Sequence, residues 1–243
     1  MNTVIFANRV VKEIIRDPIS LFFGLAFPII LLILLSMINS SIPVDLFNIS
    51  SLAPGIAVFG LSFMALFAAQ VLAKDRDSSF LARLFTTPMT SNNFILGYML
   101  PLAIMSVIQV AFCLFSSLFF SLDFTISIFA VILILIPVAF IYIGIGLTCG
   151  ILFSEKAAVG ACGAILTNLS AWLSGVWFDL ELVGGFFKQI ANVLPFLHAV
   201  ELGKAVLNGY YEEMFPHLWW VMGYAIIMIA LSIVVFKKKT QEV

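Results

Sequence analysis

Charged residues are scarce in this 243-residue chain, at 10% of the sequence, whereas hydrophobic residues make up 63% and the mean hydropathy is +1.16. A water-soluble domain is about half apolar and about a quarter charged. A soluble chain of this length could not hide so much apolar surface in one core. The composition therefore excludes a soluble globular domain and makes lipid the solvent for most of the chain.

The sequence also lacks the motifs of common catalytic and metal sites. It has no GxxxxGK[ST] phosphate loop and no HExxH motif, and its two histidines, His198 and His217, are both expected on the outer side. The three cysteines, Cys113, Cys149 and Cys162, lie in apolar stretches without CxxC spacing, which argues against disulfides and metal ligands. No basic face with interleaved aromatic residues points to nucleic acid. These absences predict a non-catalytic chain.

The apolar stretches carry no Asp, Glu, Lys or Arg near their midpoints. Charges within the membrane are the usual mark of ion coupling or proton relay, so their absence argues against a secondary carrier. A self-sufficient channel or carrier should also show charged or broken spans in corresponding halves. A lipid- or peptide-modifying membrane enzyme needs His, Asp, Glu or Ser gathered at one membrane face. Neither pattern is visible, and both classes stand as alternatives.

Long apolar runs predict an all-α membrane protein with a single transmembrane domain over residues 1–243. About twenty apolar residues cross the hydrocarbon core of a bilayer. The expected spans are 19–38, 52–73, 94–120, 126–153, 157–178 and 216–236. The third and fourth spans contain Pro101 and Pro137, each of which can kink a helix.

Basic residues predict the orientation of these six spans. With both chain ends in the cytoplasm, Lys188 and Lys204 alone among the twelve Lys and Arg residues fall on the outer side. Cytoplasmic loops of membrane proteins carry such an excess of positive charge. Any other number of spans would place basic clusters on opposite sides of the membrane.

Two further regions are predicted to be helical at the membrane surfaces. Residues 1–17 alternate at helical spacing between an apolar side (Val4, Ala7, Val11, Ile14, Ile15) and a polar side with basic residues, up to Asp17-Pro18. This pattern is typical of an interfacial helix attracted to anionic lipid. The external segment 179–215 is interrupted by Pro195 and has a C-terminal cap signal at Asn208-Gly209, which predicts re-entrant helices.

Uncharged polar residues within the expected spans are candidates for lining a substrate pathway. They are Gln70, Gln109, Asn168, Ser170 and Ser174. Hydrogen bonds between helices also explain each of these residues. For any one of them taken alone, we favour that explanation. The GxxxG run from Gly146 to Gly150 permits close helix contact, and we favour packing within the chain over a seam between subunits.

The cytoplasmic loop 74–93 combines charge with exposed apolar residues. Asp75 to Asp77 suggest N-terminal capping charges, Phe80, Leu81, Leu84 and Phe85 recur at helical spacing, and Pro88 ends the helix. Large apolar side chains are unusual on a water-facing helix. Two interpretations follow, a helix that docks in a groove of a soluble partner and a second helix that lies on the lipid.

The same segment carries a family resemblance. It reads Asp-Arg-Asp-Ser-Ser-Phe-Leu-Ala-Arg-Leu-Phe-Thr-Thr-Pro over residues 75–88 and resembles the E-R-E-x-G-x-L-x-x-L-x-x-x-P stretch of ABC-2 type ABC transporter permeases. Arg76, Leu81, Leu84 and Pro88 match, aspartates replace both glutamates, and Ser79 stands where glycine is common. The amphipathic start, the external segment around Pro195 and the six spans also resemble this family. The Phe-Leu-x-Arg-Leu-x-x-x-Pro run of residues 80–88 most resembles its drug- and antibiotic-export branch.

The resemblance implies the permease subunit of an ATP-driven exporter. A second permease copy or homologue would complete the pathway, and a separate ABC ATPase would bind ATP-Mg, so this chain would hold no cofactor. The residues implied to couple the chain to the ATPase are Asp75, Arg76, Asp77, Phe80, Leu81, Arg83, Leu84, Phe85 and Pro88. Arg76 and Arg83 would face an acidic rim of the ATPase or lipid phosphate. The expected substrate is small and amphipathic, and the expected location is a bacterial plasma membrane.

Overall fold

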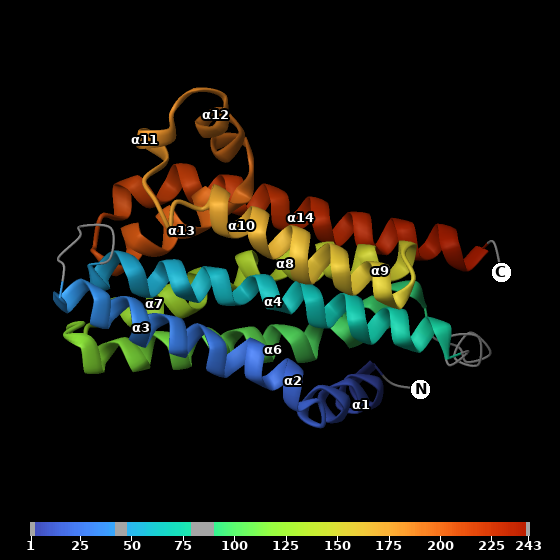
Figure 1. Ribbon diagram of the computed structural model, residues 1–243. Helices are drawn as coiled ribbons and strands as arrows, with labels where there is room; N and C mark the ends of the chain where they lie inside the picture. The colour runs from blue at the N-terminus through green and yellow to red at the C-terminus, as the bar shows by residue number, and fades with distance from the viewer. Residues whose placement is uncertain (1–2, 42–47, 79–89, 242–243) are drawn as a thin grey trace.

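The computed structural model describes residues 3–41, 48–78 and 90–241, and every element in these ranges is helical (Figure 1). The first half contains α1 (Thr3–Ile15), α2 (Pro18–Leu21), a π-helical segment (Phe22–Ala26), α3 (Phe27–Ser41), α4 (Ile49–Asp77), α6 (Ser91–Ser117) and a 3-10 turn (Leu118–Phe120). The second half contains α7 (Ser127–Ile134), α8 (Ile136–Leu152), α9 (Glu155–Gly160), a π-helical segment (Ala161–Leu166), α10 (Thr167–Leu173), α11 (Leu180–Val183), α12 (Gly185–Val193), α13 (Pro195–Leu207) and α14 (Tyr211–Gln241).

Within the described residues, five helical runs are long and apolar enough to cross a membrane. They are Pro18–Ser41, Ile49–Asp77, Ser91–Phe120, Ser127–Leu152 and Tyr211–Lys239. The helices α12 and α13 bend by 74° where they meet, and counting them as one span raises the number to six. The prediction of an all-helical, multipass membrane protein is therefore confirmed.

The expected fifth span, 157–178, differs most from the observed elements. Its helical run extends from Glu155 to Leu173 through α9, the π-helical segment and α10, and it is not one of the five spans. Charged residues at its start (Glu155, Lys156) and polar residues in α10 (Thr167, Asn168) lower its apolar character. The fourth span is interrupted at Leu135, two residues before Pro137, whereas Pro101 lies inside a continuous α6.

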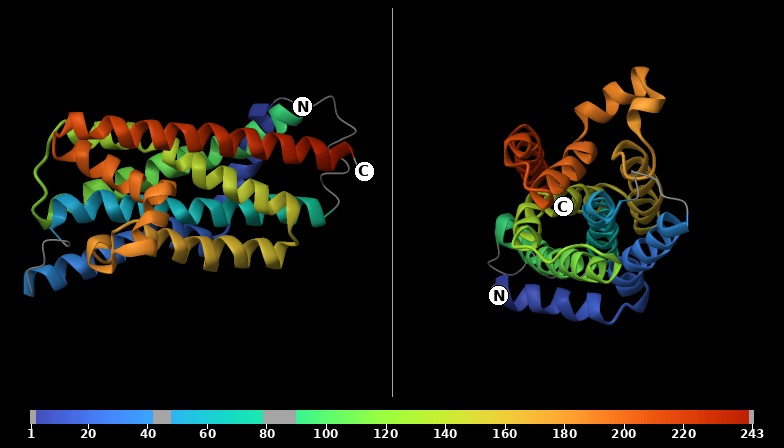
Figure 2. Two further views of the ribbon diagram at one scale, coloured as in Figure 1. Left: turned by 90° about the horizontal axis from the view of Figure 1, so that it is seen from above. Right: turned by 90° about the vertical axis from the view of Figure 1, so that its left-hand side faces the viewer.

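The helix α4 forms the centre of the bundle. Within its apolar window 89% of the residues are buried, compared with 22% for Pro18–Ser41 and 17% for α14. It contacts α3, α6, α8, α9, α10 and α13, and Figure 2 shows these helices around it in the end-on view. The outer helices therefore leave apolar faces for lipid or for another subunit.

Small residues allow α8 to approach α4 closely. A Cβ added at Gly146 would lie 2.1 Å from the carbonyl oxygen of Ala65, and one added at Gly150 would lie 2.8 Å from that of Ala69. Side chains are therefore excluded at both glycines, as in small-xxx-small contacts of other membrane helices. The GxxxG run packs within the chain, as predicted.

Both described ends of the chain lie at the same end of the bundle, together with the last turn of α4 and the α8–α9 junction (Figure 1). We call this end the terminal end and the opposite one the distal end. The helix α1 lies across the bundle axis at the terminal end, as the end-on view in Figure 2 shows. The short helices α11 and α12 project from the side of the bundle (Figure 1).

The face that α1 buries differs from the expected one. Its buried residues are Phe6, Val10 and Ile14, spaced four apart, whereas Val4 and Ile15 of the expected apolar face are 73% and 61% exposed. The buried residues pack on α6, so one apolar stripe binds protein and a second remains exposed. Sequence periodicity does not separate these two stripes, because apolar residues cover more than half of the helix surface.

Candidate functional site

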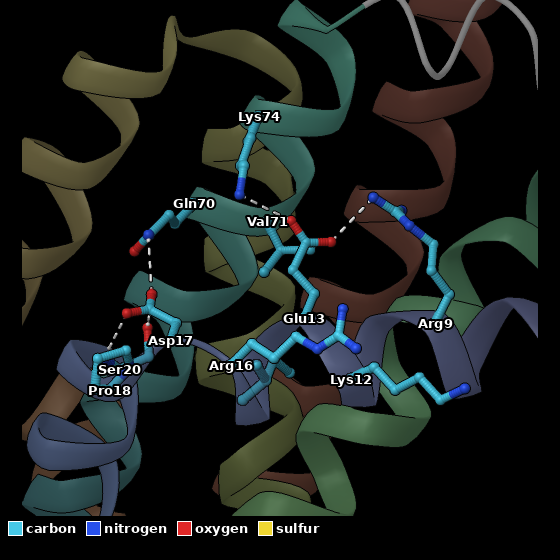
Figure 3. A pocket seen from close by; sticks show the side chains of 11 residues that line it. Arg9, Lys12, Glu13, Arg16, Asp17, Pro18, Ser20, Gln70, Val71 and Lys74 are labelled. Carbon is cyan, nitrogen blue, oxygen red and sulfur yellow. Dashed lines mark hydrogen bonds and ion pairs between the residues drawn. The ribbon is translucent and has the colours of Figure 1, made fainter.

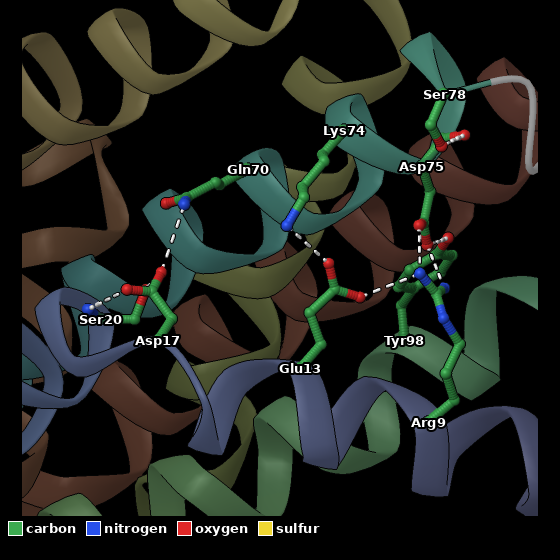
Figure 4. A network of polar contacts seen from close by, with 9 residues as sticks. All are labelled: Arg9, Glu13, Asp17, Ser20, Gln70, Lys74, Asp75, Ser78 and Tyr98. Atoms are coloured by element: carbon green, nitrogen blue, oxygen red, sulfur yellow. Dashed lines mark hydrogen bonds and ion pairs between the residues drawn. The ribbon is translucent and has the colours of Figure 1, made fainter.

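A polar network joins three helices at the terminal end (Figure 4). Its centre is Asp75, in the last turn of α4, whose side chain is only 2% exposed. Both terminal nitrogens of Arg9 on α1 donate to the Asp75 carboxylate, and the hydroxyl of Tyr98 on α6 donates to its Oδ2 at 2.6 Å. A buried carboxylate is tolerated when it is paired and hydrogen-bonded, and Asp75 meets both conditions. The three helices are therefore tied together at one residue.

Apolar contacts of α1 hold the arginine of this network in place. The ring of Phe6 packs edge-on against Tyr98, with centroids 4.9 Å apart, and also contacts Gly97. A Cβ at Gly97 would lie 2.3 Å from Cδ1 of Phe6, so the glycine leaves the space that the ring occupies. Because Phe6 packs there, Arg9 on the next turn of α1 lies with its guanidinium at the end of α4.

Glu13 extends the network along α1. Its carboxylate lies 3.0 Å from Nη2 of Arg9 and 3.1 Å from Nζ of Lys74 on α4. The hydrogen bond to Asp75 raises the pKa of Arg9 above its ordinary value, against the opposite effect of burial. The guanidinium therefore stays charged throughout the physiological pH range.

Arg76, the next residue of α4, binds a different helix. Its guanidinium donates to the carbonyl oxygens of Ile151 and Phe153, both at 2.6 Å, and to that of Gly150 at 3.2 Å. The last carbonyls of a helix have no partner within the helix and attract cations. The family resemblance implies that Arg76 faces an acidic rim or lipid phosphate, but the structure places it on the C-terminal end of α8.

We expect Arg76→Gln to lower the free energy of unfolding by about 2 kcal/mol, because charged hydrogen bonds to the α8 carbonyls are lost. Lys74→Gln is the matched control: its side chain is 57% exposed and pairs with Glu13, and such an ion pair contributes less than about 1 kcal/mol. Both can be measured by SDS titration of the purified protein in mixed micelles. Equal losses for the two variants would show that Arg76 does not cap α8.

Asp17 organises the junction of α1 and α2. It accepts hydrogen bonds from the backbone of Ile19 and Ser20 at 3.1 and 3.3 Å, from the Ser20 hydroxyl at 2.7 Å, and from Nε2 of Gln70 at 3.3 Å. Burial tends to raise the pKa of Asp17, but these hydrogen bonds outweigh it and lower the pKa below its ordinary value. Asp17 thus caps α2 and joins it to Gln70 of α4.

The five candidate pathway residues lie at separate places in the described chain. Gln70 binds Asp17 at the terminal end, and Gln109 donates to the Ala57 carbonyl at 3.3 Å inside the bundle, where its Oε1 has no hydrogen-bond partner among the described residues. The others bond as follows: Ser170 to Tyr142, Ser174 to the Ala171 carbonyl, and Asn168, on an exposed surface, to the Ala164 carbonyl. Packing roles account for these contacts, and the pathway role stays a prediction.

Only the first three of the expected coupling residues belong to the part of the chain that the structure describes. Phe80, Leu81, Arg83, Leu84, Phe85 and Pro88 lie outside the described residues. Asp75, Arg76 and Asp77 were expected to cap the following helix, but they form the last turn of α4. The helix α6 begins at Ser91 after an N-cap at Thr90, so the segment 79–89 connects the ends of two helices that both belong to the network.

Sequence reasoning missed three members of this network, Arg9, Glu13 and Tyr98. Arg9 and Glu13 are spaced four apart on one face of α1, which is a signal for a polar surface but names no partner. Tyr98 lies inside an apolar run and gives no signal of its own. The partner of Asp75 is Arg9, which is 66 residues away in the sequence, so only the folded structure identifies it.

Comparison with known proteins gives concordant results. Residues 44–234 match the family model described as ABC-2 family transporter protein. The chain is 31% identical over 246 aligned residues to the protein named "Putative transport permease ycf38" of Pyropia yezoensis, which covers 93% of this chain and 83% of the relative. The protein of the same name from Porphyra purpurea is 32% identical over 207 residues, covering 80% and 69%. Because both organisms are red algae, a bacterial plasma membrane stays a prediction.

Proposed function

Because this chain belongs to the ABC-2 family of transporters, we propose that it is the permease subunit of an ATP-driven exporter whose ATPase is a separate chain. Two permeases, identical or homologous, form the substrate pathway. The ATPase binds ATP-Mg and engages the segment 75–87, so the permease itself is not catalytic. The proposed cargo is small and amphipathic, in keeping with spans that are almost free of charge.

The observation that carries this proposal is the anchoring of the last turn of α4. Asp75 ties this turn to α1 and α6, and Arg76 ties it to the end of α8. The segment 79–89 begins directly after it. A force applied to that segment would therefore reach four helices through hydrogen bonds and ion pairs, one of them the buried centre of the bundle.

Coupling then follows as a movement of packed helices. When the ATPase pair closes on ATP, the segment moves with it, and α4 carries α1, α6 and α8 along. Such rigid-body shifts are a common means of switching proteins between two arrangements. The two arrangements here are pathways open toward opposite sides of the membrane.

The orientation in the membrane follows from charge. Arg9, Lys12, Arg16, Lys74 and the C-terminal lysines lie at the terminal end, which we place in the cytoplasm by the positive-inside rule. Both chain ends lie on the cytoplasmic side when the run Glu155–Leu173 is taken as a sixth crossing. The 74° bend between α12 and α13 then lies on the outer side, where the pair forms re-entrant helices that dip into the outer leaflet.

The test is a double substitution in the coupling segment. We expect Leu84→Asp with Phe85→Asp to leave the chain inserted and folded but to abolish retention of the ATPase, because two charges replace the apolar anchors of the docking helix. The measurement is recovery of an ABC ATPase, identified by its phosphate-binding loop, with the tagged chain from its native membrane.

Asn92→Asp with Asn93→Asp is the matched control for this experiment. These exposed residues lie in the first turn of α6, close to the same segment, and a helix N-terminus tolerates negative charge. The control should retain the ATPase as the wild type does. Retention by the Leu84/Phe85 variant as well would refute docking through this segment.

A further inference from the structure

A pocket of about 570 Å³ opens beside the network, between α1, the α1–α2 junction and α4 (Figure 3). Figure 3 shows residues of α1 on one wall and of α4 on the other. Binding sites for small molecules have volumes of about 300–1,000 Å³, so the space suffices for a polar group of that size. Its charged lining residues are Arg9, Lys12, Glu13, Arg16, Asp17 and Lys74.

Positive charge exceeds negative charge in this lining, with four basic residues against two acidic ones. Both acids are already engaged, Glu13 by Arg9 and Lys74, and Asp17 by Ser20 and Gln70.

Two basic residues of the lining keep their donors available. The side chains of Lys12 and Arg16, one turn apart on α1, make no hydrogen bond or ion pair with any described residue, and both are exposed. Because both carboxylates already have partners and these two basic side chains do not, the pocket is suited to binding an anion.

The nature of the anion follows from the donors and from the surroundings. A guanidinium presents paired N–H groups that match the oxygens of a phosphate. Ile15 and Ile19, neighbours of lining residues in the sequence, are 61% and 69% exposed, and Phe22 on the first span is 46% exposed. A soluble phosphate would make no contact with these exposed apolar side chains, whereas the acyl chains of a lipid would cover them.

We propose that this pocket binds the phosphate of an anionic phospholipid headgroup, with Arg16 and Lys12 as its principal donors. The acyl chains lie along the exposed apolar residues of α1, α2 and the start of the first span. The bound lipid bridges α1 and α4 next to Glu13 and Lys74, and so stabilises the position of α1 on which the Arg9–Asp75 contact depends. This inference does not rest on the proposed export function.

The test is native mass spectrometry of the purified full-length chain in neutral detergent, titrated with dioleoylphosphatidylglycerol or dioleoylphosphatidylcholine. We expect Lys12→Gln with Arg16→Gln to weaken the first phosphatidylglycerol-binding event about tenfold, since each basic residue near a membrane surface contributes to the attraction of anionic lipid. Lys237→Gln with Lys238→Gln removes the same charge at the same end but outside the pocket and should leave that event unchanged.

Two additional arms identify the source of the phosphate and guard against misfolding. Glycerol 3-phosphate carries the headgroup phosphate without acyl chains and should not displace the lipid. Lys12→Arg with Arg16→Lys keeps two positive charges and one guanidinium in the pocket, so it should bind the lipid more tightly than the glutamine pair does. Equal weakening by both glutamine pairs, no preference for phosphatidylglycerol over phosphatidylcholine, displacement by glycerol 3-phosphate, or loss of binding in the charge-preserving variant would each overturn the proposal.

Discussion

Asp75→Ala is expected to destabilise the protein by about 2–3 kcal/mol, because it leaves the Arg9 guanidinium and the Tyr98 hydroxyl without their buried acceptor. Removing one partner of a fully buried ion pair costs about 3–5 kcal/mol. The side chain of Arg9 is 35% exposed, so water can hydrate it in part and the expected loss is smaller. SDS titration of the purified protein measures the change.

Asp77→Ala is the matched control for this substitution. Asp77 is the same residue type two positions later, it is 47% exposed, and it pairs with Arg76 at the surface. Its removal should cost less than about 1 kcal/mol. A double variant with Arg9→Ala should lose less than the sum of the single losses, since the two residues interact directly. Additive losses, or equal losses for Asp75 and Asp77, would contradict the central position of Asp75 in the network.

Gly146→Ala is expected to cost about 3 kcal/mol, although alanine is the better helix former. The new Cβ would lie 2.1 Å from the carbonyl oxygen of Ala65 and 2.7 Å from its Cα, so backbone rather than a flexible side chain would have to move. Overpacking of this kind typically costs about 1–3 kcal/mol, and contacts with backbone belong at the upper end. The same SDS titration detects the loss.

Gly223→Ala on α14 has the opposite expected sign. A Cβ at Gly223 meets nothing within 4 Å, and alanine exceeds glycine in helix propensity by about 1 kcal/mol. A small gain in stability is therefore expected. If both glycine variants behaved alike, the close packing of α8 against α4 would be wrong.

Hydropathy is a sufficient guide to the spans whose apolar character is continuous. The predicted second and sixth spans, 52–73 and 216–236, lie within the observed α4 and α14, because any helix that crosses a bilayer needs about twenty apolar residues. The GxxxG run likewise indicated a close contact, since only small side chains allow helices to approach so closely. Its partner, the face of α4 with Ala65 and Ala69, could not be read from the sequence.

The helical run Glu155–Leu173 differs in extent from the expected span 157–178 and contains several polar residues. Its polar residues serve contacts inside the fold: Ser170 bonds Tyr142 of α8, and Thr167 bonds the Cys162 carbonyl at 3.0 Å. These contacts could not be read from the sequence, which shows only that polar residues interrupt an apolar run. The π-helical segment Ala161–Leu166 is equally invisible to a pattern of 3.6 residues per turn.

The structure places Asp75 and Arg76 of the expected coupling segment at the end of α4, with partners that the sequence did not indicate. Acidic residues are favourable at a helix N-terminus, so Asp75 suggested the start of a new helix. In the structure it ends α4, an unfavourable place for a carboxylate, and Arg9 compensates for it from 66 residues away. No local pattern contains a contact of that sequence separation. The same holds for Arg76, whose acceptors lie at the end of α8.

The most direct test of the central claim is the rate of ATP hydrolysis by the purified chain with and without its ATPase. We expect no hydrolysis by the chain alone in lipid vesicles, and hydrolysis on addition of the ABC ATPase recovered from the same membrane. The rate with wild-type chain should exceed the rate with the Leu84→Asp/Phe85→Asp variant. Hydrolysis by the chain alone, or equal stimulation by both chains, would contradict a permease driven through the segment that follows α4.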